Sequence, residues 1–279
     1  MKIARSDPAG SDLAIFSRML FIFYIFVGLL GLVIGSFLNC VIYRLEKEES
    51  LRGRSYCPHC NHTLSWKDLF PVLSFVFLRG KCRYCHKKIS IQYPVVEIST
   101  GLIFLLIFNF QFPVFSFINL IFLFYIASAL MVIFVYDIKH YVIPDAVLLF
   151  AIAITFACQL IFETHFLLFN SLWAALGAFL FFWVIYFFSK EKWMGFGDCK
   201  LAVLLGLLLG FPKIIAGLFL AFLFGAIIGI SLMILSLPAG KGKISLKSQL
   251  PFAPFLIVGT YVAMFFGNHI IQWYLHFIF

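Results

Sequence analysis

The sequence predicts an all-α polytopic membrane protein with about eight transmembrane helices and a small zinc-bound cytoplasmic loop domain between helices 1 and 2. Of the 279 residues, 63% are hydrophobic and only 12% are charged, and the mean hydropathy is +1.04. This composition excludes an ordinary soluble domain. The apolar residues fall in long runs, the basic residues gather between some of these runs, and four of the seven cysteines form two close pairs.

Eight apolar runs supply the expected membrane helices, because about 20 helical residues cross the roughly 30 Å of hydrocarbon in a bilayer. The runs cover residues 14–41, 94–111, 113–136, 143–162, 166–188, 199–211, 212–237 and 251–279. The run 199–211 is the shortest and would span poorly unless the bilayer thins or the helix starts deep. The first run lacks a small-residue cleavage site, so no cleavable signal peptide is expected.

The basic residues predict the orientation of the chain. Seventeen of the 21 lysines and arginines lie on one side of the membrane, ten of them in residues 44–93 and the others at Lys139, Lys190, Lys192, Lys200, Lys241, Lys243 and Lys247. The opposite side has Lys2, Arg5, Arg18 and Lys213. The positive-inside rule therefore places residues 44–93 in the cytoplasm and both termini outside.

This orientation divides the chain into three parts. Residues 1–43 are the N-terminal segment with the first helix, residues 44–93 are the cytoplasmic loop domain, and residues 94–279 are the main membrane domain. Topology explains the net charge of +9, so we expect the lipid bilayer as a partner and no nucleic acid.

The loop domain contains two CxxC pairs, Cys57 with Cys60 and Cys82 with Cys85. Two such turns at this separation favour one tetrahedral zinc ion with four thiolate ligands. Redox chemistry is the alternative, but it normally uses one CxxC pair. Four protein ligands leave no open position, so the zinc would be structural and would order a loop too small to build its own core.

Asp198 is an unusual residue, because it stands at the start of an apolar run and follows Gly195 and Gly197. An ionisable residue in a membrane segment is a functional candidate, and glycines allow another backbone to approach closely. However, Asp is also a favoured N-cap, where the helix dipole stabilises an anion. Taken alone, the position supports a capping role and a catalytic role about equally.

A second carboxylate can face Asp198. Asp137 ends an apolar helix, where the helix dipole opposes a negative charge, whereas Asp145 and Glu97 are expected in first turns, where capping explains them. With the predicted orientation, Asp137 and Asp198 both lie near the cytoplasmic face. Two carboxylates that share a proton supply an acid and a base, which is the chemistry of aspartic peptidases.

With these residues in place, the chain resembles the prepilin peptidases, also called leader peptidase/N-methyltransferases, of type IV pilus and type II secretion systems. The motifs that carry the resemblance are Gly35-Ser36-Phe37-Leu38-Asn39, Tyr43-Arg44-Leu45, both CxxC pairs, Leu78-Arg79-Gly80-Lys81-Cys82, Tyr93-Pro94-x-x-Glu97, Asp137-Ile138, Ile143-Pro144-Asp145, Gly195-x-Gly197-Asp198 and Pro251-Phe252-x-Pro254-Phe255. One departure is Asp68-Leu69, where many members of the family have Asp-Asn.

The resemblance implies a GxGD-type aspartyl peptidase of the bacterial inner membrane, with Asp137 and Asp198 as the catalytic pair facing the cytoplasm. Asp145 belongs to the family pattern but not to that pair. The implied substrates are prepilin or pseudopilin precursors, which are cut after the Gly that ends a short leader. The resemblance also implies methylation of the new N-terminus with S-adenosylmethionine. The sequence shows no glycine-rich turn for this cofactor, and Gly80, the one candidate, is better explained as a turn residue.

Three other interpretations remain open. The same chemistry could act on other substrates, as in presenilin-like or preflagellin peptidases, although the two CxxC pairs argue against both. A non-catalytic assembly adapter of the pilus or secretion machinery would use the zinc loop but leaves Asp137 unexplained. A transporter with a proton relay through Asp137 and Asp198 leaves the zinc loop unexplained.

Overall fold

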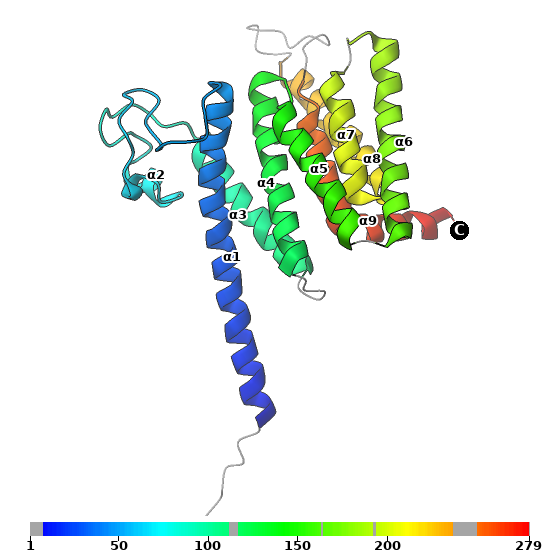
Figure 1. Cartoon of the computed structure of the whole chain (residues 1–279), viewed down its shortest axis with the longest axis horizontal. Helices are drawn as coiled ribbons and strands as arrows, with labels where there is room; N and C mark the ends of the chain where they lie inside the picture. The colour runs from blue at the N-terminus through cyan, green and yellow to red at the C-terminus, as the bar shows by residue number, and fades with distance from the viewer. Residues whose placement is uncertain (1–7, 112–116, 163, 192–193, 237–249, 279) are drawn as a thin grey trace, which may run out of the picture. The chain divides into compact units, whose positions relative to one another are not determined.

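The computed structural model describes residues 8–111, 117–162, 164–191, 194–236 and 250–278 (Figure 1). In these residues the regular secondary structure is helical, apart from two isolated β-bridges in the loop between α1 and α3. The elements are α1 (Pro8–Glu46), a 3-10 turn η1 (Trp66–Asp68), α2 (Leu73–Phe77), α3 (Gln92–Gln111), α4 (Phe117–His140), α5 (Asp145–Phe162), α6 (His165–Ser189), α7 (Phe196–Leu209), α8 (Lys213–Ser236) and α9 (Ala253–Ile278). The chain divides into two compact units, Met1–Met131 and Val132–Phe279.

The expected membrane fold is confirmed, because a helix covers each of the eight apolar runs in the described part of the chain. Seven of these helices are long and apolar enough to cross a bilayer. The remaining one, α7, has only 14 residues. It begins at Phe196, earlier than the expected residue 199, so Asp198 lies inside the helix.

The orientation in the membrane stays a prediction, and so does the division into residues 1–43, 44–93 and 94–279. Several of the basic residues on which the orientation depends lie outside the described residues, namely Lys2, Arg5, Lys192, Lys241, Lys243 and Lys247.

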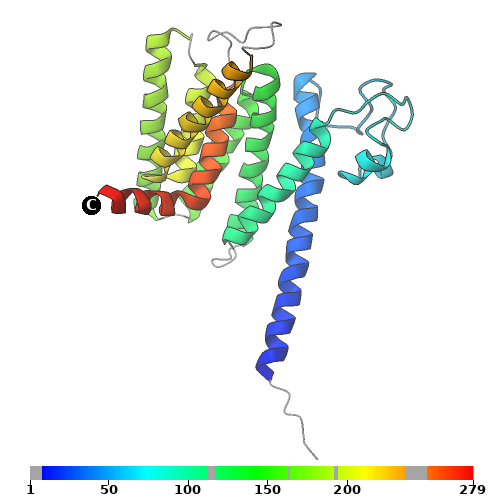
Figure 2. The ribbon, with the colours of Figure 1, turned by 180° about the vertical axis from the view of Figure 1, so that it is seen from behind.

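In the first unit, α1 and α3 pack closely together through small residues (Figure 2). A Cβ atom added at Gly31 would lie 2.7 Å from the Cα atom of Gly101, and one added at Gly35 would lie 2.7 Å from the Cα atom of Glu97. Only glycine permits this approach, which is a common way for membrane helices to gain contact area. The Asn39 side chain completes the contact by donating a hydrogen bond to the Tyr93 carbonyl at 3.0 Å.

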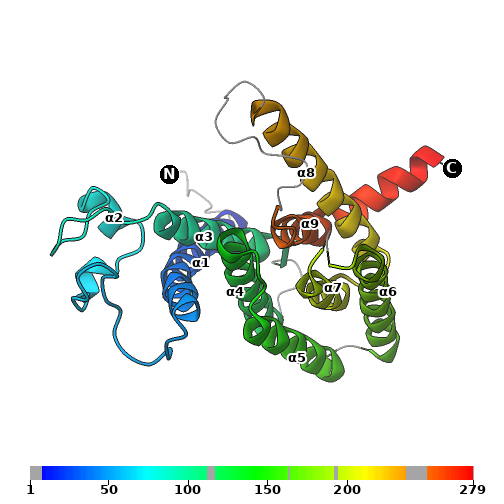
Figure 3. The same ribbon diagram turned by 90° about the horizontal axis from the view of Figure 1, so that it is seen from above.

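In the second unit, α7 is the central helix. It packs against α5, α6, α8 and α9 (Figure 3). Nine of its residues are buried, namely Asp198, Cys199, Leu201, Ala202, Leu204, Leu205, Gly206, Leu207 and Leu209. A Cβ atom added at Gly206 would lie 2.4 Å from the Cα atom of Ala175, so α6 and α7 touch backbone to backbone. The apolar sequence of α7 therefore reflects burial in protein, and its first turn holds a carboxylate within this core.

Candidate active site

The second unit brings Asp137 and Asp198 together. Asp137 lies in the last turn of α4 and Asp198 in the first turn of α7. Their residues are 5% and 9% exposed, and the two carboxyl groups interact electrostatically. The two aspartates are therefore close enough to interact within one compact unit, and their catalytic roles stay a prediction. An ionised pair in such a buried place would be costly, so the site favours one shared proton.

Each carboxylate also receives one backbone N–H group. The N–H of Gly195 donates to Asp198, and the N–H of Ala253, the first residue of α9, donates to Asp137. The Oδ2 atom of Asp137 is buried and has no hydrogen-bond partner among the described residues. Buried polar atoms are rarely left without a partner, so this oxygen is a position where a reacting molecule could bind.

The N-cap of α7 is Gly195 and not Asp198. Asp198 is therefore not the N-cap residue, and the interpretation that placed it there is wrong. Asp198 reaches back from the third helical position to the N–H of the N-cap residue, which is the carboxylate half of a capping box. The same side chain thus helps to start α7 and lies beside Asp137, so the two interpretations of Asp198 are compatible.

The two glycines before Asp198 have different surroundings. A Cβ atom added at Gly197 would meet the Ile143 side chain at 3.3 Å, whereas one added at Gly195 would meet nothing closer than 4.0 Å. Gly197 is therefore needed for packing against the segment that leads into α5. Gly195 is exposed, which leaves its backbone open to a substrate.

Asp145 lies in the first turn of α5, as expected, and it also makes an ion pair that the sequence did not predict. Lys200 Nζ lies 2.8 Å from one of its carboxylate oxygens and 2.9 Å from the other. Lys200 stands two positions after Asp198, and its Nζ atom lies 5.3 Å from the centre of the Phe196 ring. Asp145 thus connects the start of α5 to the start of α7 and makes no contact of its own with the aspartate pair in the described structure.

Glu97 does not have the role that the sequence predicts for it. The helix α3 begins at Gln92, so Glu97 lies beyond the first turn, and the expected capping role is wrong. Its carboxylate is buried and accepts hydrogen bonds from the Val72 N–H group, at 2.7 Å, and from the Ser36 hydroxyl. Glu97 therefore attaches the loop domain to the α1–α3 pair within the first unit.

The four expected metal ligands, Cys57, Cys60, Cys82 and Cys85, are brought together in the loop. Their sulfur atoms all lie within 4.8 Å of one another, and the Cys57 and Cys85 sulfurs are 3.9 Å apart. Zn–S bonds of 2.3 Å in a tetrahedron require sulfur separations of about 3.8 Å. The cluster therefore fits zinc, and its four thiolates could hold one ion.

The two CxxC turns are copies of one structure. In the first, Cys57 N–H donates to His62 O and Asn61 N–H to Cys57 O; in the second, Cys82 N–H donates to Lys87 O and His86 N–H to Cys82 O. Asn61 and His86 both have positive φ, at 54° and 56°. Isolated bridges close both turns, Tyr56 with Thr63 and Lys81 with Lys88. Equivalent turns that each present two thiolates are what a four-cysteine site needs.

The pKa values of the cluster thiols are shifted in opposite directions. Burial acts to raise the pKa of Cys57, but hydrogen bonds from the backbone N–H groups of His59 and Cys60 lower it to about 7. The backbone N–H of Lys87 acts to lower the pKa of Cys85, but burial and the neighbouring thiols raise it to about 11. The support for a metal site is therefore the arrangement of the four sulfur atoms. His59, His62 and His86 are all exposed, and none belongs to the cluster of sulfur atoms. They are surface residues, as expected.

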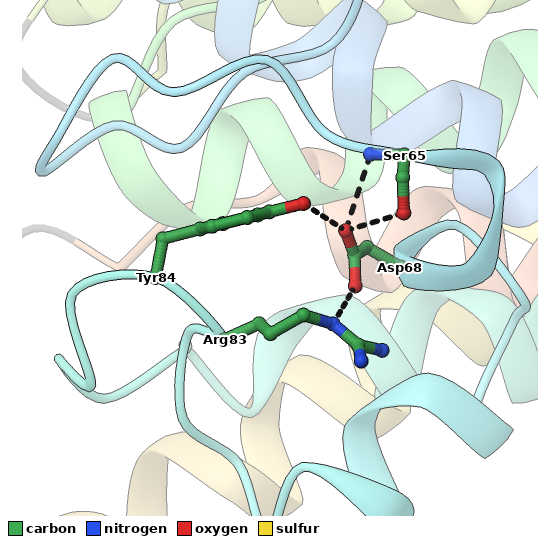
Figure 4. A network of polar contacts seen from close by, with 4 residues as sticks. All are labelled: Ser65, Asp68, Arg83 and Tyr84. Atoms are coloured by element: carbon green, nitrogen blue, oxygen red, sulfur yellow. Dashed lines mark hydrogen bonds and ion pairs between the residues drawn. The ribbon is translucent and has the colours of Figure 1, made fainter.

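Asp68 connects the two halves of the loop domain (Figure 4). Its carboxylate accepts hydrogen bonds from the Ser65 N–H and hydroxyl groups, from the Tyr84 hydroxyl and from Arg83 Nε at 2.7 Å. Burial acts to raise the pKa of Asp68, but the bonds from Arg83 and Ser65 outweigh it and hold the pKa below its ordinary value. Both carboxylate oxygens of Asp68 therefore accept hydrogen bonds, although Leu69 follows it where many members of the family have Asn.

Gly80 is a turn residue. It has φ +68°, and a Cβ atom added there would meet the Phe75 ring at 3.1 Å. Its N–H donates to Phe75 O, and its carbonyl accepts from Ile89 N–H. The turn before the second CxxC pair accounts for this glycine without a cofactor.

Comparison with known proteins gives two matched regions of the chain. Residues 29–112 match the profile of the bacterial peptidase A24 N-terminal domain, and residues 122–230 match the type IV leader peptidase family. The first region contains all four cysteines, and the second contains both aspartates. No solved structure matches the chain.

Several curated proteins are similar over nearly the whole chain, and each is named prepilin leader peptidase/N-methyltransferase. A protein of Bacillus subtilis is 33% identical over 261 residues, which cover 92% of this chain and 98% of that protein. A protein of Aeromonas hydrophila is 30% identical, covering 91% of this chain and 94% of its own. The membrane-helix fold and the matched family regions define a membrane peptidase. The chain belongs to the type IV leader peptidase family.

Proposed function

We propose that the protein is an aspartyl endopeptidase that removes the leader of type IV prepilins or pseudopilins at the cytoplasmic face of the bacterial inner membrane. The observation that carries the proposal is the buried, interacting pair Asp137 and Asp198, one oxygen of which has no partner in the described structure. The family relationship supplies the substrate class. The cut would fall after the Gly that ends the leader.

The reaction is the hydrolysis of one peptide bond by water. One aspartate takes a proton from the water as its oxygen attacks the scissile carbonyl, and the other donates a proton to the leaving nitrogen as the C–N bond breaks. The products are a carboxylic acid on the leader and an amine on the mature chain, and transfer of the acid's proton to the amine gives a carboxylate and an ammonium group. The pair returns to its starting state by passing one proton across.

Helix ends favour Asp198 as the base. Asp198 lies in the first turn of α7, where the helix dipole stabilises its anion. Asp137 faces the first residue of α9 but lies in the last turn of α4, so two opposite helix ends act on it. We therefore assign the shared proton to Asp137, which acts as the acid.

The second proposed activity is methylation of the newly exposed N-terminus with S-adenosylmethionine. The names of the relatives support it. The loop domain would hold one structural zinc ion on Cys57, Cys60, Cys82 and Cys85. The zinc would supply folding free energy to the loop and no chemistry at the aspartates.

Cleavage of a synthetic precursor by the purified protein tests the proposal. Asp137→Asn and Asp198→Asn should each lower the rate by about 100-fold or more, because an amide keeps the shape but cannot exchange the proton. Asp145→Asn is the matched control and should retain activity. If Asp137→Asn cuts well while Asp145→Asn is inactive, the assigned pair is wrong. Mass spectrometry of the product, with and without S-adenosylmethionine, tests the methylation separately.

A further inference from the structure

The loop domain has an apolar surface that neither the zinc site nor the aspartate pair explains. It lies on η1, α2 and the residues between them. Its members are large apolar residues that are exposed in the structure, namely Trp66, Leu69, Phe70, Leu73, Val76 and Phe77. Phe77 is 81% exposed and Val76 is 63% exposed. A patch of this kind on a small domain marks an interaction site.

A groove crosses this surface and combines apolar walls with positive charge. Its volume is about 380 Å³, and it is lined by Lys67, Phe70, Leu73, Ser74, Phe77, Leu78 and Arg83. Asp68 contacts Arg83 through Nε, and the two terminal nitrogens of the guanidinium point away from that carboxylate (Figure 4). The groove therefore offers two cations beside aromatic and aliphatic side chains.

The charged residues around the apolar surface are predominantly basic. Residues 66–91 contain six basic residues, Lys67, Arg79, Lys81, Arg83, Lys87 and Lys88, and one acid, Asp68. Exposed apolar side chains flanked by lysine and arginine are the features that hold interfacial segments on anionic membranes.

A hydrogen bond holds this surface beside the start of a candidate membrane helix. The Val72 N–H group, at the start of α2, donates to Glu97 Oε2 at 2.7 Å. Glu97 lies five residues into α3, and the part of α3 that is long and apolar enough to cross a bilayer begins at Gln92. Figures 1 and 2 accordingly show α2 at the height of the first half of α3. The surface therefore lies beside the first turns of this helix, where an interfacial segment would contact the bilayer.

The turn into α2 has an unusual backbone conformation that its contact with Glu97 stabilises. Val72 has φ 60° and ψ −49°, and Leu73 N–H donates to Pro71 O. This is a γ-turn of the rare, strained kind, and β-branched residues seldom adopt it. A strained turn persists where the surroundings determine it, and here Glu97 binds its central N–H. The orientation of α2 relative to α3 is therefore fixed within the first unit.

We propose that η1, α2 and the groove form a membrane-interface anchor that binds anionic phospholipid of the leaflet next to the loop domain. Acyl chains lie against Phe70, Leu73 and Phe77, and the phosphate group binds Lys67 and the free end of Arg83. The anchor holds the zinc domain against the bilayer. It is independent of the cleavage chemistry.

Photo-crosslinking in the full chain tests the anchor. A photoreactive phenylalanine analogue is placed at position 73 or 77, and for comparison at position 51. Leu51 belongs to the same loop and is 56% exposed, against 55% for Leu73, but lies outside the surface. The protein is reconstituted in nanodiscs of equal parts phosphatidylglycerol and phosphatidylcholine. Phospholipid adducts should form at 73 and 77 with severalfold higher yield than at 51.

The headgroup part has its own control. Lys67→Gln should lower the ratio of phosphatidylglycerol to phosphatidylcholine adducts at position 77, whereas Lys47→Gln, in the same loop, should leave the ratio unchanged. Equal adduct yields at 51, 73 and 77 would overturn the anchor. So would adducts at 77 that move from lipid to peptide when a prepilin precursor is added, because the groove would then bind substrate. An unchanged ratio in Lys67→Gln would remove Lys67 from the headgroup site.

Discussion

Lys200 Nζ lies within hydrogen-bond distance of both carboxylate oxygens of Asp145, 55 residues away in the sequence. The pair joins the first turns of α5 and α7, and Lys200 stands one half-turn after Asp198. It therefore fixes the helix end that carries one member of the aspartate pair. We therefore expect Asp145 to support the site through this contact and not to transfer protons.

Breaking this ion pair should weaken cleavage without abolishing it. The Asp145 side chain is 59% exposed, and exposed pairs contribute about 0–1 kcal/mol. Asp145→Asn and Lys200→Gln should therefore each lower kcat/KM by less than about tenfold. The double variant should be no worse than the poorer single variant, because both changes remove one contact. Additive losses would show that the two residues act separately.

Gly195 and Gly197 should respond differently to alanine. Gly195→Ala should leave thermal stability unchanged, because the added methyl group meets no protein atom closer than 4.0 Å, but it should raise KM by crowding the substrate backbone. Gly197→Ala should lower stability, because the methyl group would press on Ile143 at 3.3 Å. Thermal unfolding and steady-state cleavage of both variants separate the two effects. A fully active Gly195→Ala enzyme would contradict the substrate role.

The contact between α6 and α7 depends on Gly206. An added Cβ atom would lie 2.4 Å from the Ala175 Cα atom and 2.6 Å from its nitrogen, so Gly206→Ala should destabilise the protein by at least about 1–3 kcal/mol. Gly177→Ala is the matched control, since nothing lies within 4 Å of its added methyl group. Its unfolding temperature should match that of the wild type. If both variants lost a similar amount of stability, the cause would be the replacement of a helical glycine in general and not the close contact between α6 and α7.

The purified protein should contain one zinc ion per chain. Cys57→Ser should lose the metal and expose the loop to proteolysis, while the helical circular dichroism of the membrane part persists. Cys158→Ser changes a cysteine of α5 outside the cluster and should keep the metal. Metal analysis under reducing conditions decides the matter. A metal-free protein with a Cys57–Cys60 disulfide would disprove the site.

The sequence predicted the helices and the cysteine cluster because their signals are local. Apolar runs and CxxC spacing need no knowledge of distant parts of the chain. The start of α7 was misplaced because Gly195-Phe196-Gly197 is a sequence typical of a loop, whereas the structure has Gly195 as the N-cap and Phe196 and Gly197 in the first turn of the helix. Gly197 has a low helix propensity, but it packs closely on Ile143.

The misread contacts all depend on residues far apart in the chain. In the sequence alone, Glu97 is interpreted as an acidic residue at a helix start and Asp145 as a capping residue. The structure adds the hydrogen bond from Val72 N–H to Glu97 and the ion pair between Asp145 and Lys200. The Ala253 N–H group belongs to the backbone, so no side-chain pattern could indicate its contact with Asp137. The Pro251-Phe252-x-Pro254-Phe255 motif marked the right segment without indicating that role.

The two CxxC turns of the loop domain are equivalent, and each supplies two of the four sulfur atoms. Neither turn alone can bind a metal ion as tightly as both together, so the ion stabilises the loop domain only when both turns bind it. Residues 47–91 are the only covalent connection from α1 to α3. Without the metal, α1 and α3 would be joined by a loop whose two halves are not held together by the ion. The association of the two helices would then depend on their direct contacts, which include the Asn39–Tyr93 and Tyr24–Asn109 hydrogen bonds and the close approach at Gly31 and Gly35.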